Sequence, residues 1–536
     1  MKHFVLIFLS IVFLLVSSCK DPLQITDPNW LEEESFYKNE KEAFLGLVGV
    51  YDAFQARGLM GKSYREFDII TDNATYRSGA EWRAIESDIH ISSDARIARF
   101  WTDYYVIINR ANRMIDKVSV MPDDLFKSQS KSRILAEAAF LRAYAYYDLT
   151  AIWGNVPFYT KTKERSDAAE AATFKKDIYA WIINDLKTFV IPNLPKIVPL
   201  SERGRIPKAA AEALLGKYYL TEENWSKAAE IFFGIIDSKQ YELYPDYAEL
   251  FTEKGEFSKE SLFEINFTGK GIDTGEGFST RIDTTLALTW PSQQIIPIAD
   301  LVDSYLCTDG KPIVADYSPN GYGAKSPGYV SGSNNVNTNT TRFKDRDPRL
   351  RASIYTFMDK RPSGVRLWNY NNVGDFAIKK YSIISSQQYE NGGPQNYYVI
   401  RYADVLLMYA EAKNEELAIP DQSIYDAVNE IRNRLKTMAL YPAGLTKEQM
   451  RKRIRDERRW EFAFEHQRFF DLKRWKDDQG NPLLLTLPPA SFPADNEGVF
   501  RKRASIPRVY TWPYPQEEMD GGNRALQAQG QNQGYY

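Results

Sequence analysis

Cysteine and histidine are scarce in this chain of 536 residues, and both shortages limit its chemistry. Only Cys19 and Cys307 are present, so no framework of several disulfides can form. The three histidines and two cysteines do not cluster at the spacing of a zinc site. We therefore predict no metal held by cysteine or histidine, no cofactor and an inert Cys307. Calcium bound by loop carboxylates stays open.

An excess of positive charge is also missing. The sequence has 68 Lys and Arg against 71 Asp and Glu, for a formal net charge of −3. Nucleic-acid binding needs clustered cations that face phosphates, so this composition argues against it. The glycine-rich stretch 269–275 has the spacing of neither a dinucleotide-binding motif nor a P-loop, and we interpret it as an ordinary loop.

Long apolar runs are absent after the first twenty residues, so no later segment reaches the roughly 18 residues of a membrane-spanning helix. A charged start followed by an apolar run from Phe4 to Val16 is typical of a secretory signal peptide. The Val-Ser-Ser-Cys sequence that ends at Cys19 resembles a bacterial lipobox. We predict that residues 1–18 are cleaved before a lipidated Cys19, and that the lipid anchors the protein in the cell outer membrane, exposed at the surface.

Two parts of the chain, about 100–262 and 398–476, show the apolar periodicity of paired helices. One pair also has the offsets of a tetratricopeptide repeat, in which small residues let two antiparallel helices approach and large ones fill the groove. We therefore predict a mainly α-helical repeat fold. The offsets are carried by Leu215, Gly216, Tyr219, Ala228 and Phe232.

A further helix signal lies near the C-terminal end of the chain. Thr446 to Gln449 have the form of a capping box, which predicts a helix that runs to about Trp475. Because helical repeats appear at both ends of the chain, we predict one domain over 19–536, a solenoid interrupted by a long insertion between roughly Phe267 and Tyr398.

The predicted loop-rich regions are about 20–99, 263–397 and 477–536, with a strand-like stretch at 262–267. Such long polar loops in a compact protein are usually functional or disordered, and interspersed tyrosines favour function. A large ring in a loop also has less reason to be buried than one in a helix. The tryptophans that fall in predicted loops are Trp30, Trp82, Trp290, Trp368 and Trp512.

Four sequence blocks, in chain order, match one known family. They are AEAAFLRA (136–143) with YYDL (146–149) and WGNVP (153–157); LVDSY (301–305) with DGK (309–311) and RDPRL (346–350); IRYADVLLMYAEA (400–412); and ERR (457–459), EFAFE (461–465) and RFFDLKRW (468–475). With these blocks the chain resembles the SusD/RagB family, the surface lipoproteins of Bacteroidetes nutrient-uptake systems. It departs from the family pattern at His466, where a glycine is usual.

This resemblance implies a fold of about four tetratricopeptide-like helix pairs packed against an irregular region, and a protein that is not an enzyme. It implies a SusC-like TonB-dependent outer-membrane transporter as the partner, over which the lipoprotein sits as a lid. The implied ligand is an oligosaccharide or polysaccharide. A peptide- or protein-binding receptor of the RagB kind is the alternative.

Aromatic side chains in the predicted loops are the candidates for contact with a sugar. A pyranose presents weakly positive C–H groups that stack on the face of an aromatic ring, and its hydroxyls need hydrogen-bond partners. In the family, the ligand surface comes from the loop before the first repeat and from the insertion. We therefore predict Trp82 and Trp290 as stacking platforms, with Asn73 and Arg77 as polar contacts at the rim. The predicted site also includes Asp72, Tyr76, Tyr322 and Tyr329.

Three glutamates, Glu457, Glu461 and Glu465, follow one another at a spacing of four residues and would line one helix face. A pair of carboxylates could perform glycoside hydrolysis, which is the enzyme hypothesis. We favour a structural ion network instead. A scaffold that closes the transporter without a ligand of its own is the last alternative. The expected neutralising partners are Arg458, Arg459 and Arg468.

Overall fold

Helices dominate the described structure, which confirms the predicted mainly α-helical repeat fold. The short strands form two-stranded pairs. The computed structural model describes residues 36–56, 58–61, 63–76, 84–86, 89–128, 130–163, 169–267, 295–313, 343, 345–356, 359, 376–381, 395–487 and 510–532. Trp30, Trp82, Trp290 and Trp368 lie outside these ranges.

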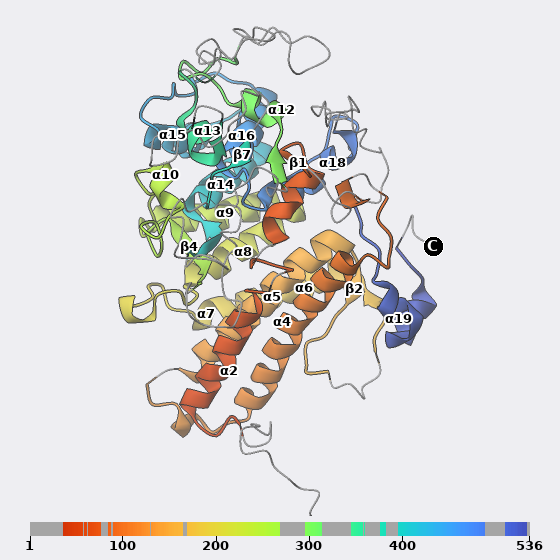
Figure 1. Cartoon of the computed structure of the whole chain (residues 1–536). Coiled ribbons are helices and arrows are strands. Elements are labelled where there is room, and N and C mark those ends of the chain that lie inside the picture. Colours follow the sequence, from red (N-terminus) through yellow and green to blue (C-terminus); the bar gives the residue numbers. More distant parts are fainter. Residues whose placement is uncertain are drawn as a thin grey trace, which may run out of the picture.

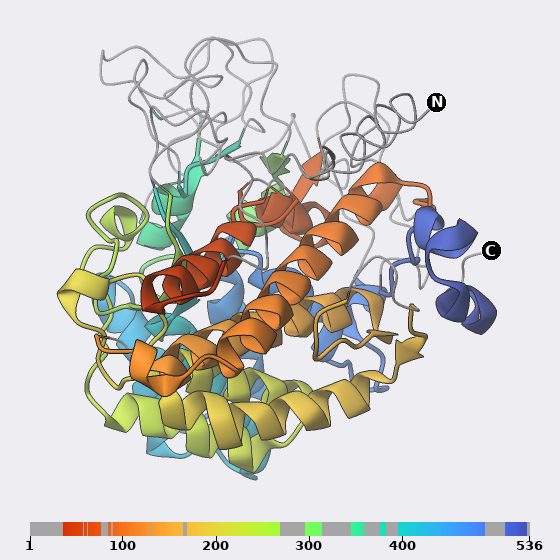
Figure 2. The same cartoon turned by 90° about the horizontal axis from the view of Figure 1, so that it is seen from below.

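The first group of helices consists of α2 (Glu40–Ala53), α4 (Ala95–Ser119) and α5 (Lys131–Trp153), which pack side by side (Figures 1 and 2). Side chains all around α5 are buried from Ile134 to Thr150, because neighbouring elements cover every face of the helix. After α5 the chain continues through α6 (Lys175–Asp185), η4 (Leu186–Val190) and α7 (Ile191–Asn193).

The helix pair predicted from tetratricopeptide offsets is confirmed. It consists of α8 (Lys208–Thr221) and α9 (Trp225–Asp237). Gly216 makes the close approach possible, because a Cβ at this position would lie 2.5 Å from the ring of Phe232.

The C-terminal helices continue the packing of the N-terminal ones. α14 (Tyr402–Glu416) packs against α9, against α15 (Gln422–Arg434) and against α16 (Lys447–Glu461). Residues 238–401, which include the insertion, therefore separate two helices that are neighbours in space.

Two strands close the base of the insertion. β4 (Ser261–Ile265), where a strand was predicted, pairs antiparallel with β8 (Tyr397–Arg401), with register shifts near Phe263. The chain thus leaves and re-enters the helical region at one place. Smaller elements within and around the insertion are α10 (Tyr247–Leu250), β5 (Ile295–Pro297), α12 (Ala299–Ser304), α13 (Pro348–Ser353), β6 (Ile354–Tyr355) and β7 (Ala377–Ile378).

The prediction of one helix from Thr446 to about Trp475 is only partly right. The capping box of Thr446 and Gln449 is present and α16 begins after it, but the helix ends at Glu461. Phe464 and His466 have φ of 64° and 67°, which interrupts the helix before α17 (Gln467–Arg474) begins. This left-handed conformation explains why glycine suits the position of His466.

The C-terminal segment returns to the first helices rather than simply covering the surface as loops. Trp512, one of the tryptophans of predicted loops that had less reason to be buried, is fully buried: its ring stacks on Phe67 at 5.5 Å and meets Trp153 edge-on at 5.7 Å. The segment ends in η9 (Glu518–Gly522) and α19 (Arg524–Gln529), beside β2 (Val156–Pro157) and β3 (Ala172–Thr173) (Figure 1). Within the described ranges, no helix combines the length and apolarity needed to cross a membrane.

Candidate ligand-binding site

The site predicted from the sequence centres on a short antiparallel ladder. β1 (Ala74–Tyr76) pairs with β5, and Tyr76 lies opposite Ile295 at its end. Trp82 follows Tyr76 by six residues in the sequence, and Trp290 precedes Ile295 by five. The described segment that precedes Trp82 in the sequence therefore ends beside the start of the described segment that follows Trp290.

Several predicted site residues fall on parts of the chain that the structure does not describe. Their roles stay predictions. They are Trp82, Arg77, Trp290, Tyr322 and Tyr329, together with the predicted lipidation site Cys19.

Asn73 is placed inside the protein and not at a rim. Its side chain is fully buried, and its amide donates to Asp68 Oδ1 at 2.7 Å while its carbonyl accepts from Arg459 Nε at 3.0 Å. Its backbone carbonyl accepts from Ile298 N at 3.0 Å, which extends the β1–β5 pairing. Because both ends of the amide are occupied internally, Asn73 braces the ladder, and the expected surface contact with a sugar is not available to it in this structure.

Asp72 and Tyr76 also point to a supporting role. The carboxylate of Asp72 accepts two hydrogen bonds from Arg468, both at 2.8 Å, and lies 3.3 Å from Arg459 Nη2. Tyr76 is buried, with 5% of its surface exposed. Asp72 fastens the chain between η2 (Ser63–Ile70) and β1 to the α16–α17 region.

Asp68 adds an unusual carboxyl to this support. Burial raises its pKa to about 7, although the hydrogen bond from Asn73 acts in the opposite direction. The group therefore exchanges a proton near neutral pH, beneath the ladder rather than in an open cleft.

The three glutamates at positions 457, 461 and 465 form a buried ion network, as predicted. Glu461 contacts three guanidinium groups: Arg434 Nη2 at 2.6 Å, Arg401 Nη1 at 3.1 Å and Arg349 Nη1 at 3.2 Å. Burial raises the pKa of Glu461, but the charges of these arginines outweigh burial and hold the pKa well below its ordinary value.

The other two glutamates are paired in the same way. Glu457 lies 2.7 Å from Arg349 Nη2 and 2.5 Å from Arg432 Nη1, and Glu465 lies 2.7 Å from both Arg401 Nε and Lys380 Nζ. A glycoside hydrolase needs one carboxyl kept protonated as an acid, which requires a raised pKa. Burial acts that way on Glu457 too, but Arg349 and Arg432 lower its pKa overall. The network is suited to holding elements together.

The prediction of which arginines neutralise the three glutamates was wrong. Arg458 pairs with Asp404 and Asp471, each at 2.8 Å, and Arg459 and Arg468 turn toward Asp72. Successive residues of a helix point about 100° apart, so arginines adjacent to Glu457 in sequence cannot share its face. The true partners come from distant segments, which the sequence alone does not bring together.

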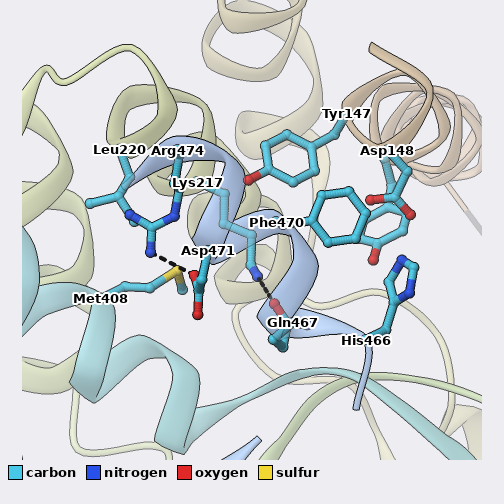
Figure 3. Close-up of a pocket in the computed structure, with 11 residues that line it drawn as sticks. Tyr147, Asp148, Lys217, Leu220, Met408, His466, Gln467, Phe470, Asp471 and Arg474 are labelled. Carbon is cyan, nitrogen blue, oxygen red and sulfur yellow. Dashed lines mark hydrogen bonds and ion pairs between the residues drawn. The ribbon is translucent and has the colours of Figure 1, made fainter. Parts of the chain in front are cut away.

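Figure 3 shows a small polar cavity between α5, α8, α14 and α17. Its volume is about 10 Å³, which suits at most one water molecule. Lys217 and Asp404 form an ion pair at 2.6 Å beside it, and Asp471 pairs with Arg474 at 2.7 Å. This cavity is too small for a ligand and belongs to the packing of the helices. No group of three or more His, Cys, Asp or Glu side chains that could hold a metal ion occurs in the described part of the chain.

Comparison with known proteins shows which family models and relatives the chain matches. A family model described as "SusD family" matches residues 259–535, and one described as "Starch-binding associating with outer membrane" matches residues 30–220. SusD-like protein P25 of Formosa agariphila is 25% identical over 491 residues, which cover 87% of this chain and 88% of the relative.

Solved structures of similar proteins have the same fold. A SusD-like carbohydrate binding protein from Bacteroides fragilis is 25% identical with a TM-score of 0.73, over 91% of this chain and 99% of that one. A laminarin binding SusD-like protein is 24% identical with a TM-score of 0.64, over 93% and 100% of the two chains. Since the first family model alone covers more than half of the sequence, the chain belongs to the SusD family.

Proposed function

We propose that this protein is a non-catalytic receptor on the bacterial cell surface that captures oligosaccharides or polysaccharides. It delivers them to a SusC-like TonB-dependent transporter in the outer membrane. Lipid on Cys19 anchors it there.

The observation that carries the proposal is the pairing of Tyr76 with Ile295. It brings together the described ends of the two chain segments on which the predicted platforms Trp82 and Trp290 lie in sequence. Aromatic rings on these two segments suit a chain of sugar units, because each ring can stack on one pyranose face.

The supports of this ladder favour a site that keeps its shape. Asn73 is bonded to Asp68 and to Arg459, and Asp72 binds Arg468 through two parallel hydrogen bonds. Bidentate carboxylate–guanidinium pairs fix geometry as well as charge. A surface that is already ordered loses less conformational entropy when a flexible glycan binds.

The names of related proteins support a carbohydrate ligand. One solved relative is called a carbohydrate binding protein, another is called laminarin binding, and a matching family model is described as starch-binding and outer-membrane associated. The buried, fully paired glutamates support a role without catalysis. Membership of the SusD family supports the SusC-like partner.

Binding to a panel of polysaccharides in native affinity gels tests the proposal. We expect retarded migration in at least one glycan and no release of reducing ends from it over hours of incubation. Binding to peptides with no glycan retarding the protein would favour a peptide receptor of the RagB kind instead. Hydrolysis of a bound glycan by purified protein would contradict the non-catalytic role.

A further inference from the structure

A second cavity lies in the helical part of the protein, between the loop that joins α7 to α8 and the chain that leads into β4. Figure 1 shows these elements on a different side of the molecule from β1. The cavity has a volume of about 200 Å³, several times the roughly 30 Å³ that one water molecule occupies in the liquid. It is smaller than the roughly 300–1,000 Å³ of sites for drug-sized ligands, so it suits one small molecule or one sugar unit.

The walls of the cavity are held in place by backbone contacts. Lys208 N donates to the carbonyl of Pro195 at 2.8 Å and closes the α7–α8 loop. On the other wall, Glu242 N donates to the carbonyl of Lys259 at 3.3 Å, and Tyr244 N donates to Glu260 Oε2 at 2.7 Å. The cavity is therefore part of the folded frame.

The charge of the lining is mostly positive. Four cations and one carboxyl group line it, and two of the cations are already paired. Arg205 contacts Glu137 at 2.7 Å and Glu202 at 3.1 Å, and Lys259 contacts Glu242 at 3.2 Å. The other two, Arg203 and Lys196, are exposed and form no ion pair with any residue that the structure describes. At longer range the charge of Arg203 lowers the pKa of Glu256 and Glu264, and that of Lys196 lowers the pKa of Glu212, against the larger effect of burial.

Aromatic and polar groups lie beside these two cations. The Arg203 guanidinium lies 4.8 Å from the ring centroid of Phe257, which holds the charge over the cavity. Next in sequence, the hydroxyl of Ser258 is buried and has no hydrogen-bond partner among the described residues. Gln240 and Tyr241 complete this side of the lining. The Ser258 oxygen has almost no exposed surface, so Gln240 and Tyr241, and not Ser258, supply the polar groups on this side of the cavity.

The one carboxyl group in the lining offers little opposition to an anion. Glu264 accepts hydrogen bonds from Phe257 N at 3.0 Å, Asn396 Nδ2 at 3.1 Å and Ser261 Oγ at 2.9 Å. Burial raises its pKa to about 7, so much of it is uncharged at neutral pH.

We propose that this cavity binds a single anionic sugar unit, with its carboxylate or sulfate against Arg203 and Lys196 and its hydroxyl groups on Gln240 and Tyr241. That the anion is a sugar rests on the proposed function, whereas the positive charge of the lining does not. A simple inorganic anion would leave most of the volume unfilled. The site would let the receptor hold charged glycans at a second point, away from the β1–β5 ladder.

Calorimetric titration of the purified protein tests this with four probes: methyl β-D-glucuronide, D-glucose 6-sulfate, methyl β-D-glucoside and sodium sulfate. We expect binding of at least one of the two anionic sugars, and the two probes distinguish a carboxylate from a sulfate ester. R203Q should weaken this binding at least tenfold, because a hydrogen bond to a charged group is lost, and Q240A should weaken it by about threefold.

R453Q is the matched control, since Arg453 also lies over a ring, 5.3 Å from that of Tyr441, but on α16. It should leave binding unchanged.

Three outcomes would overturn the proposal. They are absence of binding by both anionic sugars, equal affinity for the neutral glucoside or for sulfate alone, and an R203Q variant that binds like the wild type. A W82A/W290A variant should keep this binding; if it loses it, the separate site is wrong. A wild-type protein that binds an anionic sugar but is retarded by no polysaccharide would contradict the proposed function and leave this cavity standing.

Discussion

Tyr76 lies opposite Ile295 at the end of the β1–β5 ladder, although more than 200 residues separate them in the chain. Their pairing depends on a frame of polar groups beneath the ladder, chiefly the buried Asp68 and Asn73 and the half-buried Asp72. The stability of that frame, the packing of the repeat helices and the pH response of buried carboxyls can each be tested separately.

Replacing Asp72 should destabilise the frame. In D72A, Arg459 and Arg468 lose the carboxylate that both contact, and we expect the free energy of unfolding to fall by about 2 kcal/mol, less than for a fully buried pair because these side chains are partly exposed. Urea denaturation measures this. D52A removes the same group from an exposed pair with Arg110 and should change stability by less than about 0.5 kcal/mol. Equal effects of the two variants would contradict the bracing role of Asp72.

Glycine at position 216 should be required by packing rather than by backbone conformation. We expect G216A to lower stability by about 1–3 kcal/mol, because the added methyl group would overlap the ring of Phe232. G234A, in α9, meets nothing within 4 Å and should instead gain about 0.5–1 kcal/mol, as alanine usually does in a helix. Thermal unfolding of both variants measures these changes in stability. A stabilised G216A would show that the helices are not in close contact there.

Glu264 should make stability depend on pH. Its pKa is raised by burial from 4.5 to about 7 in the folded protein, so its contribution is fully present below about pH 4.5 and is lost as pH rises through 7. The full loss is about 3 kcal/mol, at roughly 1.4 kcal/mol per pKa unit. E264Q should therefore lose less stability than the wild type between pH 5 and pH 8 in urea titrations. Parallel pH profiles for the two proteins would refute this assignment.

Much of the helical region could be predicted, because its signals are local. The Gly216–Phe232 offset gave the α8–α9 pair, and the Thr446 capping box gave the start of α16. The break before α17 was missed, since Phe464 and His466 adopt a left-handed conformation without being glycine, and tertiary contacts must hold them there.

The site was harder to predict because its contacts join distant parts of the chain. Asn73 looked like a surface residue, yet Arg459 reaches it from α16 and buries it. Trp512 falls in a segment without periodicity, and only the folded chain brings Phe67 against its ring. The partners of Glu461 come from segments more than twenty residues away in the sequence.

The most direct test of the receptor function is calorimetric titration of W82A and W290A with a glycan that the wild type retains in affinity gels. We expect each substitution to weaken binding about tenfold or more, since loss of one stacked ring commonly costs 0.5–1.5 kcal/mol beyond its buried area. F174A, which removes a ring that is 60% exposed before α6, is the control and should bind as the wild type does. Wild-type affinity in both tryptophan variants would contradict the account.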